Sequence, residues 1–485
     1  MTDTVTPSDA SLLTAIAEVP AAAWARWFGD RIRETGEVPS RTLVASFSLP
    51  AGTGHAALCL FDTALGATDP AGTTLNQAAI RRWAGAAPPE AMVLYEHTDT
   101  DGVVLWTLAD AWADPDLRDW LREALSAGAS LRADGWEWHA APERPAVSHL
   151  ADGPSRVLTG RRHDVVILEP SAVAVVYRRL TRNASPELEL LRHLERVPSI
   201  LVAPPILGSA IIVSPAGQRT ASSVLVEIPG DSDTVRSIVV SRLRRSLEGD
   251  PSLQAVALDD VRAVGVIARE LHAALGRPFD QGIIAGAVPA IARDVDTWVA
   301  RAAAALASVT LALTSAPHDG ELAAGLALLP GKLQQFAAVA ESAPGLIHRV
   351  HGTLTLDTVL ISPPRVLRVV ELDGDALLSD IERITPQSPW RDVARLLVSI
   401  AEAAIEAARA AGGDAKALEI AWLWEREARK ACLEGYGTGG GALHALLAIF
   451  EVEFASRLLL DGLLDPQADR LVASHTLQRL SRTIV

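Results

Sequence analysis

Two short stretches hold most of the residues in this chain that could do chemistry. Residues 351–360 contain His351 and Asp357, and residues 370–375 contain three closely spaced acids: Glu371, Asp373 and Asp375. Carboxylates can bind Mg²⁺, and a positioned Asp can act as a general base. The two stretches therefore form a candidate site for metal binding or acid–base chemistry.

Each of these residues also has a structural interpretation. Asp357 is either a displaced base or a solvated loop carboxylate. Asp373 and Asp375 are either metal ligands or an acidic turn that follows a strand. We expect His351 to anchor its loop by hydrogen bonding rather than to catalyse. The pair Arg391–Asp392 is expected to be structural, as an ion pair or cap contact at a helix start.

Short segments spread over most of the chain resemble, in the same order, motifs of the actinobacterial maltokinase family. They are residues 108–117, 176–179, 185–190, 224–230, 271–275, 351–360, 370–375 and 387–394. The resemblance implies an α+β, two-lobed protein-kinase-like fold (aminoglycoside phosphotransferase-like) with an N-terminal α+β cap domain. It implies a cap domain over residues 1–150, a small lobe over 151–232 and a helical large lobe over 233–485.

The catalytic positions implied by this resemblance hold the wrong residue types. Val175 stands at the strand lysine, Thr353 at the catalytic base, Thr358 at the second metal ligand and Glu371 at the metal Asp. A threonine hydroxyl has no anionic form near neutral pH, and losing a positioned base typically costs about 10²–10⁴ in rate. Glutamate can bind Mg²⁺, but its longer arm fits octahedral geometry poorly, so Glu371 is a weak metal candidate.

A shift of the alignment cannot restore the lysine, because the chain has only three: Lys332, Lys416 and Lys430. Glu189, the partner that the resemblance implies for the missing lysine, is present. The resemblance places the phosphate loop at residues 159–164. This segment has a single glycine and larger side chains than such a loop needs, which leaves less room for backbone amides to approach a phosphate. Arg161 and Arg162 either meet phosphate or form an exposed basic turn, and Arg178 or Arg179 could face phosphate in a rearranged site.

Composition narrows the function classes. At 485 residues the chain is expected to hold two or three domains, and 49% hydrophobic residues allow a large core. A net charge of −15 argues against nucleic acid and against a polybasic membrane site. Cys59 and Cys432 are expected to be buried thiols in a reducing compartment, so we expect a cytoplasmic protein. The polar N-terminus does not resemble a signal peptide, and we expect no membrane span.

The chain is expected to change from strands to helices near residue 233. Helices are expected at residues 9–33, 115–127, 186–197, 256–275, 290–315, 321–343, 390–411, 415–434 and 441–461. Strands are expected at residues 42–49, 56–61, 91–97, 103–108, 155–158, 164–168, 172–177 and 224–227, with a short β segment inside 351–370. In the last long helix, an apolar stripe at Leu446, Phe450, Phe454 and Leu458 either packs inward or holds another chain.

The sequence favours a catalytically degenerate maltokinase-like protein, a pseudokinase. It would act as a binding, scaffold or regulatory subunit, with trehalose, maltose or α-glucan metabolism implied by the resemblance. A partner protein such as trehalose synthase or an active maltokinase is expected, as is binding of a sugar or nucleotide, with ATP and Mg²⁺ bound weakly. The alternative is an active ATP-dependent sugar kinase with a rearranged site that uses Glu371, Asp373 and Asp375 for metal.

Overall fold

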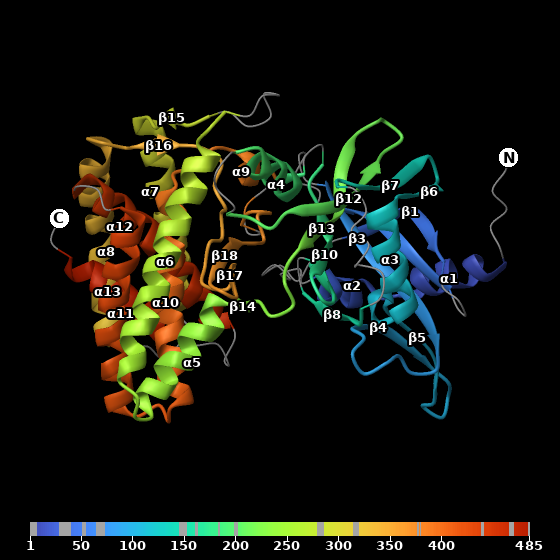
Figure 1. Cartoon of the computed structure of the whole chain (residues 1–485), viewed down its shortest axis with the longest axis horizontal. Coiled ribbons are helices and arrows are strands. Elements are labelled where there is room, and N and C mark those ends of the chain that lie inside the picture. Colours follow the sequence, from blue (N-terminus) through green and yellow to red (C-terminus); the bar gives the residue numbers. More distant parts are fainter. Residues whose placement is uncertain are drawn as a thin grey trace. The chain divides into compact units, whose positions relative to one another are not determined.

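The chain folds into two compact units. The first contains Met1–Arg192 and Pro204–Gly230, and the second contains His193–Ala203 and Asp231–Val485. Strands dominate the first unit and helices the second (Figure 1), which confirms the predicted change near residue 233. The computed structural model describes residues 7–28, 40–50, 55–64, 73–144, 153–160, 163–182, 185–197, 202–278, 286–313, 320–375, 378, 380–437, 441–464 and 470–483.

The first sheet is antiparallel and has the order β1-β2-β3-β5-β4, with β11 paired to β3. Its strands are β1 Ser40–Leu49, β2 His55–Ala64, β3 Thr73–Ala84, β4 Val93–Thr98, β5 Val104–Asp110 and β11 Arg179–Leu180. The four strands expected here are confirmed, whereas β3 was not predicted. The polar side chains of β3 (one Asn, one Gln and two Arg) interrupt the alternation of apolar and polar residues that is typical of a strand. Nevertheless, Asn76, Gln77, Ile80 and Arg81 are buried in the centre of the sheet.

Two short helices pack against this sheet where one helix was expected. They are α1 (Pro7–Glu18) and α2 (Ala21–Phe28), and residues 29–33 of the prediction lie outside the described part of the chain. Pro20 explains the break, because proline has no N–H and its ring clashes with the carbonyl four residues earlier in a continuous helix. Leu12, Ile16, Trp24 and Trp27 join side chains of the sheet in one buried cluster.

The second sheet is antiparallel, in the order β6-β7-β12-β13-β10-β9-β8. Its strands are β6 Ala129–Ala133, β7 Trp136–Pro142, β8 Ser155–Thr159, β9 His163–Leu168, β10 Ala172–Tyr177, β12 Ile206–Val213 and β13 Arg219–Glu227. The predicted helices are confirmed as α3 (Pro115–Ala127), capped by Asp114, and α4 (Pro186–Arg196). Because β6 and β7 share this sheet with β8, β9, β10, β12 and β13, strands from both sides of residue 150 build it. The division into three domains stays a prediction.

The second unit is a helical assembly whose predicted members are all present. Its helices are α5 Val235–Leu247, α6 Ser252–Leu275, α7 Ala292–Leu313, α8 Gly320–Glu341, α9 Asp380–Ile384, α10 Trp390–Ala410, α11 Ala415–Tyr436, α12 Gly441–Leu464 and α13 Leu471–Arg482. The helices α5, α9 and α13 were not predicted. Leu446, Phe450 and Phe454 of α12 are buried, so these three residues of the predicted stripe pack inward, whereas Leu458 is partly exposed.

The short β segment inside 351–370 is confirmed as a hairpin of β17 (Val359–Ser362) and β18 (Val366–Val369). The strand β14 (Asp233–Thr234) extends it, and β15 (Val288–Pro289) pairs separately with β16 (Leu346–Ile347). Two of the long helices, α7 and α8, are apolar enough to span a membrane by length and composition alone. In the apolar windows of these helices, 28% of α7 and 39% of α8 is buried within the structure.

Candidate functional site

The loop before β17 is held by a buried carboxylate on α10. Asp392 Oδ2 accepts hydrogen bonds from the backbone N–H of His351 at 2.8 Å and from His272 Nε2 at 3.1 Å. Its Oδ1 accepts from the N–H of Gly352 at 2.7 Å. Burial opposes ionisation of this carboxyl, but the hydrogen bonds from His272 and the loop outweigh it and lower the pKa of Asp392. Asp392 is thus structural, as expected, but it anchors a distant loop and does not cap its own helix.

Glycine is required beside this anchor. Gly352 has φ +89°, and a Cβ there would lie 2.9 Å from the backbone N of Asp375. Any L-residue would be strained in this left-handed conformation and would also push the two loops apart. The His-Gly pair therefore fits the loop to the 370–375 turn, whether or not the site is catalytic.

His351 is the loop anchor that the sequence predicted. Its side chain is fully buried, with Nε2 2.8 Å from the carbonyl oxygen of Val370. The N–H of Thr353 donates to Nδ1 at 3.3 Å. Because Nδ1 accepts, Nε2 carries the proton and donates to Val370, which fixes the neutral tautomer. Both ring nitrogens are used, so His351 has no free nitrogen for proton transfer.

The two threonines at the resemblance-implied base and metal positions differ in their bonding. The Thr353 hydroxyl is buried and has no hydrogen-bond partner among the described residues. The Thr358 hydroxyl closes the loop, because it accepts from the N–H of Thr355 at 3.0 Å and donates to the carbonyl of Thr355 at 3.1 Å. Neither threonine presents an anionic or exposed oxygen.

We expect Thr353→Val to raise the free energy of unfolding by about 1–3 kcal/mol, because it removes a buried hydroxyl that lacks a hydrogen bond. Thr358→Val is the matched control and should lower it by about 1–3 kcal/mol, since the N–H and carbonyl of Thr355 lose a partner. Urea unfolding of the two variants measures both changes. A loss of stability in Thr353→Val equal to that of Thr358→Val would contradict this account of the hydroxyl.

Glu371 adopts an unusual backbone conformation. It follows β18 with φ +62°, in the left-handed region that non-glycine residues rarely occupy. Such backbone strain often accompanies functional turns. The turn sets the direction of the Glu371 side chain, which is half-buried. Glu371 stands at the position where the resemblance implies a metal ligand.

The two aspartates after Glu371 contact arginines. Asp375 Oδ2 lies 3.0 Å from Arg391 Nη2 and 3.1 Å from Arg457 Nη1. Glu453 completes the group, 2.5 Å from Arg391 and 2.7 Å from Arg457. The carbonyl of Asp373 accepts from Arg383 Nε at 2.9 Å. Two guanidinium groups therefore compensate the carboxylate of Asp375, which favours its structural interpretation over a role as a metal ligand.

Asp357 is the exposed carboxylate of the loop. Its side chain is 54% exposed, and Oδ2 lies 3.4 Å from Arg236 Nη1. Although the side chain is half exposed, partial desolvation by neighbouring residues raises the pKa of Asp357 above the ordinary carboxyl value, while the charge of Arg236 acts in the opposite direction. Among the described residues, no group of three or more His, Cys, Asp and Glu side chains is arranged to hold a metal ion.

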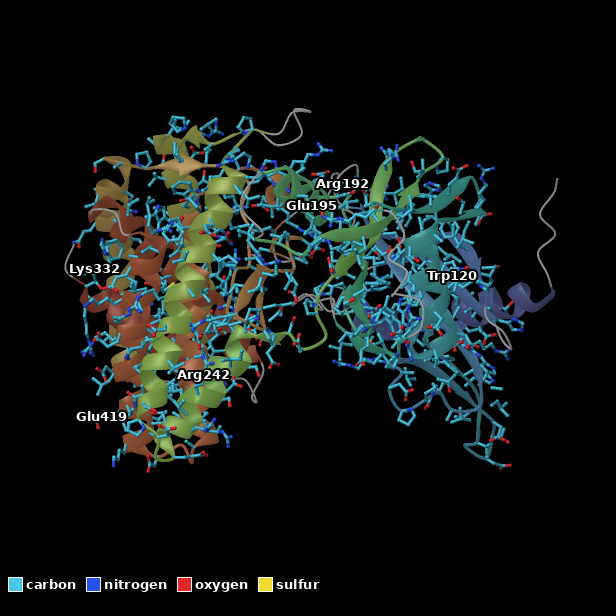
Figure 2. The ribbon with its side chains drawn as sticks, in the orientation of Figure 1. Trp120, Arg192, Glu195, Arg242, Lys332 and Glu419 are labelled. Carbon is cyan, nitrogen blue, oxygen red and sulfur yellow. The ribbon has the colours of Figure 1, made fainter. Side chains whose placement is uncertain are left out.

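In the first unit, Val175 lies in β10 between two other valines. Its Cα partners are Val224 on β13 and Val165 on β9, so three aliphatic side chains cross this face of the sheet where the resemblance places a lysine. The first lysine of the chain, Lys332, lies on α8 of the second unit, and its Nζ donates to the carbonyl of Thr483 at 2.8 Å (Figure 2).

The acidic residues of α4 are engaged locally. Glu189 Oε1 accepts from the N–H of Ser185 at 2.9 Å and so caps the start of the helix. Glu187, which the sequence analysis did not single out, accepts from the Tyr177 hydroxyl at 2.5 Å. Tyr177 follows Val175 by two positions, so this bond ties β10 to α4.

The prediction that Arg178 or Arg179 could face phosphate is wrong for Arg178. Its side chain is 2% exposed, and Nη2 lies 2.8 Å from Asp164. It also donates to the carbonyl of Trp27 at 2.9 Å and stacks over the Trp27 ring. A guanidinium held this way stabilises the fold and cannot reach a ligand. Arg161 and Arg162 lie outside the described residues.

Comparison with known proteins places the fold. No family model matches the chain. A glucosamine kinase structure in complex with glucosamine, ADP and inorganic phosphate is similar, with a TM-score of 0.58 and 18% identity over 94% of this chain and 97% of that chain. A second crystal form of glucosamine kinase gives 0.62 and 18% over 94% of this chain and 98% of that chain. At this identity the likeness shows the fold alone: the chain has the kinase-like fold of a sugar kinase.

Proposed function

We propose that this protein is a catalytically degenerate relative of the sugar kinases, a pseudokinase that acts by binding. The observation that carries the proposal is Thr353. At the position implied for the catalytic base, the chain has an un-ionisable hydroxyl that is also buried and without a hydrogen-bond partner among the described residues. Such a group can neither accept the proton of a substrate hydroxyl nor orient it.

Three further positions support the loss of phosphoryl transfer. Val175 has an aliphatic side chain at the position where the resemblance implies a lysine. The Thr358 hydroxyl is hydrogen-bonded to Thr355. The Glu371 side chain is longer than the Asp that the resemblance implies at its position. Mg²⁺ requires near-ideal octahedral geometry. Glu371 lies on a constrained turn, and the Thr358 hydroxyl is already hydrogen-bonded to Thr355, so the two residues are poor ligands for this ion. We therefore expect ATP and Mg²⁺ to bind weakly.

The loop at residues 351–360 is held in place by buried hydrogen bonds, although it lacks the side chains that phosphoryl transfer needs. Asp392, His351 and Gly352 hold it with buried hydrogen bonds, and a preorganised loop of this kind suits ligand recognition. The similar glucosamine kinase was solved with a sugar and a nucleotide. We propose the same two ligand classes here, a small sugar and an adenine nucleotide, without transfer between them.

A protein partner is part of the proposal. The resemblance to maltokinases favours a scaffold or regulatory role in trehalose, maltose or α-glucan metabolism in the cytoplasm. Trehalose synthase or an active maltokinase is the partner we propose. Fold-level analogy supports this partner more weakly than the residues support the loss of catalysis.

The alternative function is an active ATP-dependent sugar phosphotransferase with a displaced base. Asp357 favours it, because this carboxylate lies four positions from Thr353, is half exposed, and has a raised pKa. Asp357→Asn separates the two functions. A pseudokinase is unaffected by the change, whereas an enzyme using this base should lose about 10²–10⁴ in rate.

We expect the purified protein to bind a nucleotide or sugar without sugar-dependent ADP release. Thermal shift with ATP, with and without Mg²⁺, and with glucosamine, maltose, glucose and trehalose measures binding, since a ligand raises stability according to its concentration over its dissociation constant. A coupled assay on the same sample measures turnover. Turnover that is lost in Asp357→Asn would establish the alternative.

A further inference from the structure

A pocket in the second unit lies apart from the residues of the candidate site. It is formed between the helices α11 and α13 and has a volume of about 810 Å³, which falls in the range of small-molecule pockets. Trp422 lines it, 14 residues before Tyr436 on α11. Tyr436 contacts His272, which bonds to the loop anchor Asp392. At about 1.5 Å per residue, about 21 Å of helix lie between Trp422 and that contact.

The walls of this pocket combine aliphatic and aromatic side chains. Leu418 and Leu423 of α11 form the aliphatic part, and Leu423 is 48% exposed. The ring of Trp422 on α11 stacks on that of His475 on α13, with centroids 3.7 Å apart and planes 14° from parallel. The stacking orders both rings, so the pocket has an aromatic wall of fixed geometry.

Glu425 lines the same pocket with a carboxylate that lacks a hydrogen-bond donor. Its side chain is 7% exposed, and among the described residues no group donates a hydrogen bond to it. Arg429 approaches at 3.6 Å, but that guanidinium is bound to Glu451, which is buried. Burial raises the pKa of Glu425, while the charges of Arg429 and Arg479 act in the opposite direction. A hydroxyl or N–H group of a ligand would give this carboxylate the donor that the described residues do not supply.

The charges beside the pocket oppose a charged ligand of either sign. Burial lowers the pKa of His475, and the charges of Arg479 and Arg429 lower it further, so a positive charge is disfavoured beside this ring. A carboxylate ligand would instead meet Glu425 and the exposed Glu419 on α11 (Figure 2). A neutral ligand that carries both donors and acceptors avoids both penalties.

We propose that this pocket binds a neutral saccharide, with the C–H face of a pyranose ring against the Trp422–His475 pair and hydroxyl groups on Glu425 and Arg479. A carboxylate accepts from hydroxyl hydrogens and a guanidinium donates to hydroxyl oxygens, so neighbouring hydroxyls of one ring can use both. Arg479 is 34% exposed, and in the described contacts it uses Nη2, toward Glu451 at 2.9 Å, so its other N–H groups can donate to a ligand. An apolar ligand of the same size would leave Glu425 without a donor. The inference goes beyond the proposed function and does not depend on it, because none of these residues belongs to the candidate site.

Isothermal titration of the full chain with maltose tests the proposal. We expect saturable binding that equal concentrations of glucosamine or glucuronate, a cationic and an anionic ring of the same size, do not displace. Glu425→Met removes the acceptor and should weaken maltose binding roughly 10- to 100-fold, the value of a hydrogen bond to a charged group. Trp422→Ala removes half of the aromatic wall and should weaken binding at least about 10-fold, whereas Trp422→Phe keeps a ring and should bind much as the wild type does.

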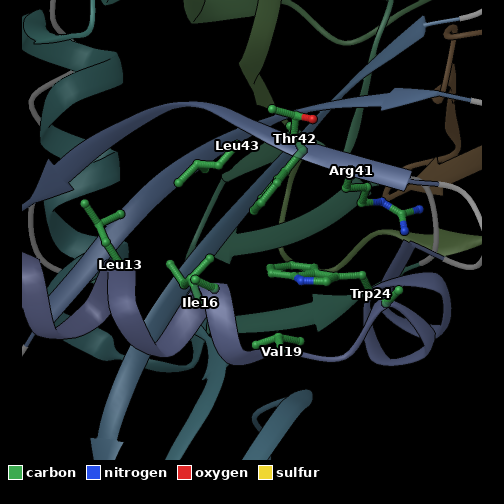
Figure 3. Close-up of a pocket in the computed structure, with 10 residues that line it drawn as sticks. Leu13, Ile16, Val19, Trp24, Arg41, Thr42 and Leu43 are labelled. Carbon is green, nitrogen blue, oxygen red and sulfur yellow. The ribbon is translucent and has the colours of Figure 1, made fainter.

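Two substitutions outside the pocket are the controls. Trp120→Ala removes another half-exposed tryptophan, on α3 of the first unit (Figure 2). Leu13→Trp alters a second pocket, of about 390 Å³, between α1, α2, β1 and β2 (Figure 3). Leu13, Ile16 and Val19 line that pocket, and its described lining residues include no carboxylate. Neither control should change maltose binding.

Thermal melting establishes that each variant is folded. If one is not, Arg479→Met, at a partly exposed side chain, replaces it with the same expected weakening. Absence of saturable maltose binding to the wild type, or displacement by glucosamine or glucuronate, would overturn the proposal. Unchanged affinity in folded Glu425→Met or Trp422→Ala would overturn it as well and would assign the sugar to the candidate site, so that the proposed function stands. A loss in either control as large as in Trp422→Ala would contradict the location.

Discussion

Replacing Asp392 with alanine is expected to lower the free energy of unfolding by about 3–5 kcal/mol. The substitution leaves the N–H groups of His351 and Gly352 and the ring of His272 without their shared acceptor. All of these groups are buried, and a buried donor without an acceptor costs about 1–3 kcal/mol. Urea unfolding measures the loss, and hydrogen exchange at the two amides locates it in the loop.

Asp357→Ala is the control for this prediction. It removes a carboxylate from the same loop, but that side chain is 54% exposed, so the change should stay within about 0.5 kcal/mol.

The pKa of Asp392 is lowered in the folded state. Its contribution is therefore present above the unfolded-state value of about 3.9 and is lost as the pH falls through the folded-state pKa. A stability loss below 1 kcal/mol at neutral pH would contradict the anchoring role.

Arg178→Met is expected to destabilise the first unit by about 3–5 kcal/mol at neutral pH, because it leaves a carboxylate buried without its cation. Asp164 pairs with this guanidinium, and Asp110 lies in the same buried cluster. The methionine keeps most of the apolar contact with Trp27, so the loss reports chiefly on charge. Arg132→Met, at an ion pair whose arginine is 75% exposed, should change stability by no more than about 0.5 kcal/mol.

The pH dependence of this variant has a defined sign. Burial raises the pKa values of Asp110 and Asp164 in the folded protein, the charge of Asp110 raises that of Asp164 further, and Arg178 acts against both. Without Arg178 the folded state takes up protons more readily than the unfolded state. The penalty of Arg178→Met should then grow as the pH rises from the unfolded-state carboxyl pKa and shrink on acidification. A penalty that grows on acidification would refute this assignment.

Sequence patterns predicted elements whose signals are local. The helix α3 has an Asp-Pro start, and Asp114 does accept the N–H of Asp116. The helix α10 is a long run of apolar residues, and 16 of its 21 residues are buried, as expected of a helix in the centre of a core. The strand β3 could not be predicted from the sequence, because the burial of its polar side chains depends on partners that are distant in the chain. Gln77, for example, donates to the carbonyls of Tyr177 and Ser222, 100 and 145 positions away.

The same distinction holds for the candidate site. The residue types at 351–360 and 370–375 are visible in the sequence, and His351 was predicted to be a loop anchor. The partners that decide their roles are remote in the chain. Asp392 lies 41 positions from His351, and Arg457 lies 82 positions from Asp375. Such pairings follow from tertiary packing. The sequence predicted an ion pair or cap contact at Arg391–Asp392, whereas Arg391 pairs with Asp375 and Glu453, and Asp392 accepts hydrogen bonds from His272, His351 and Gly352.

The central claim is that the fold of a sugar kinase persists here without phosphoryl transfer. A single-turnover measurement tests it most directly, with protein in excess over γ-labelled ATP, Mg²⁺, and glucosamine, maltose, glucose or trehalose in turn. Our account predicts no labelled sugar phosphate above a heat-inactivated control, because Thr353 cannot act as the base and Val175 cannot hold the phosphates. Formation of labelled product that saturates with one of these sugars would contradict it.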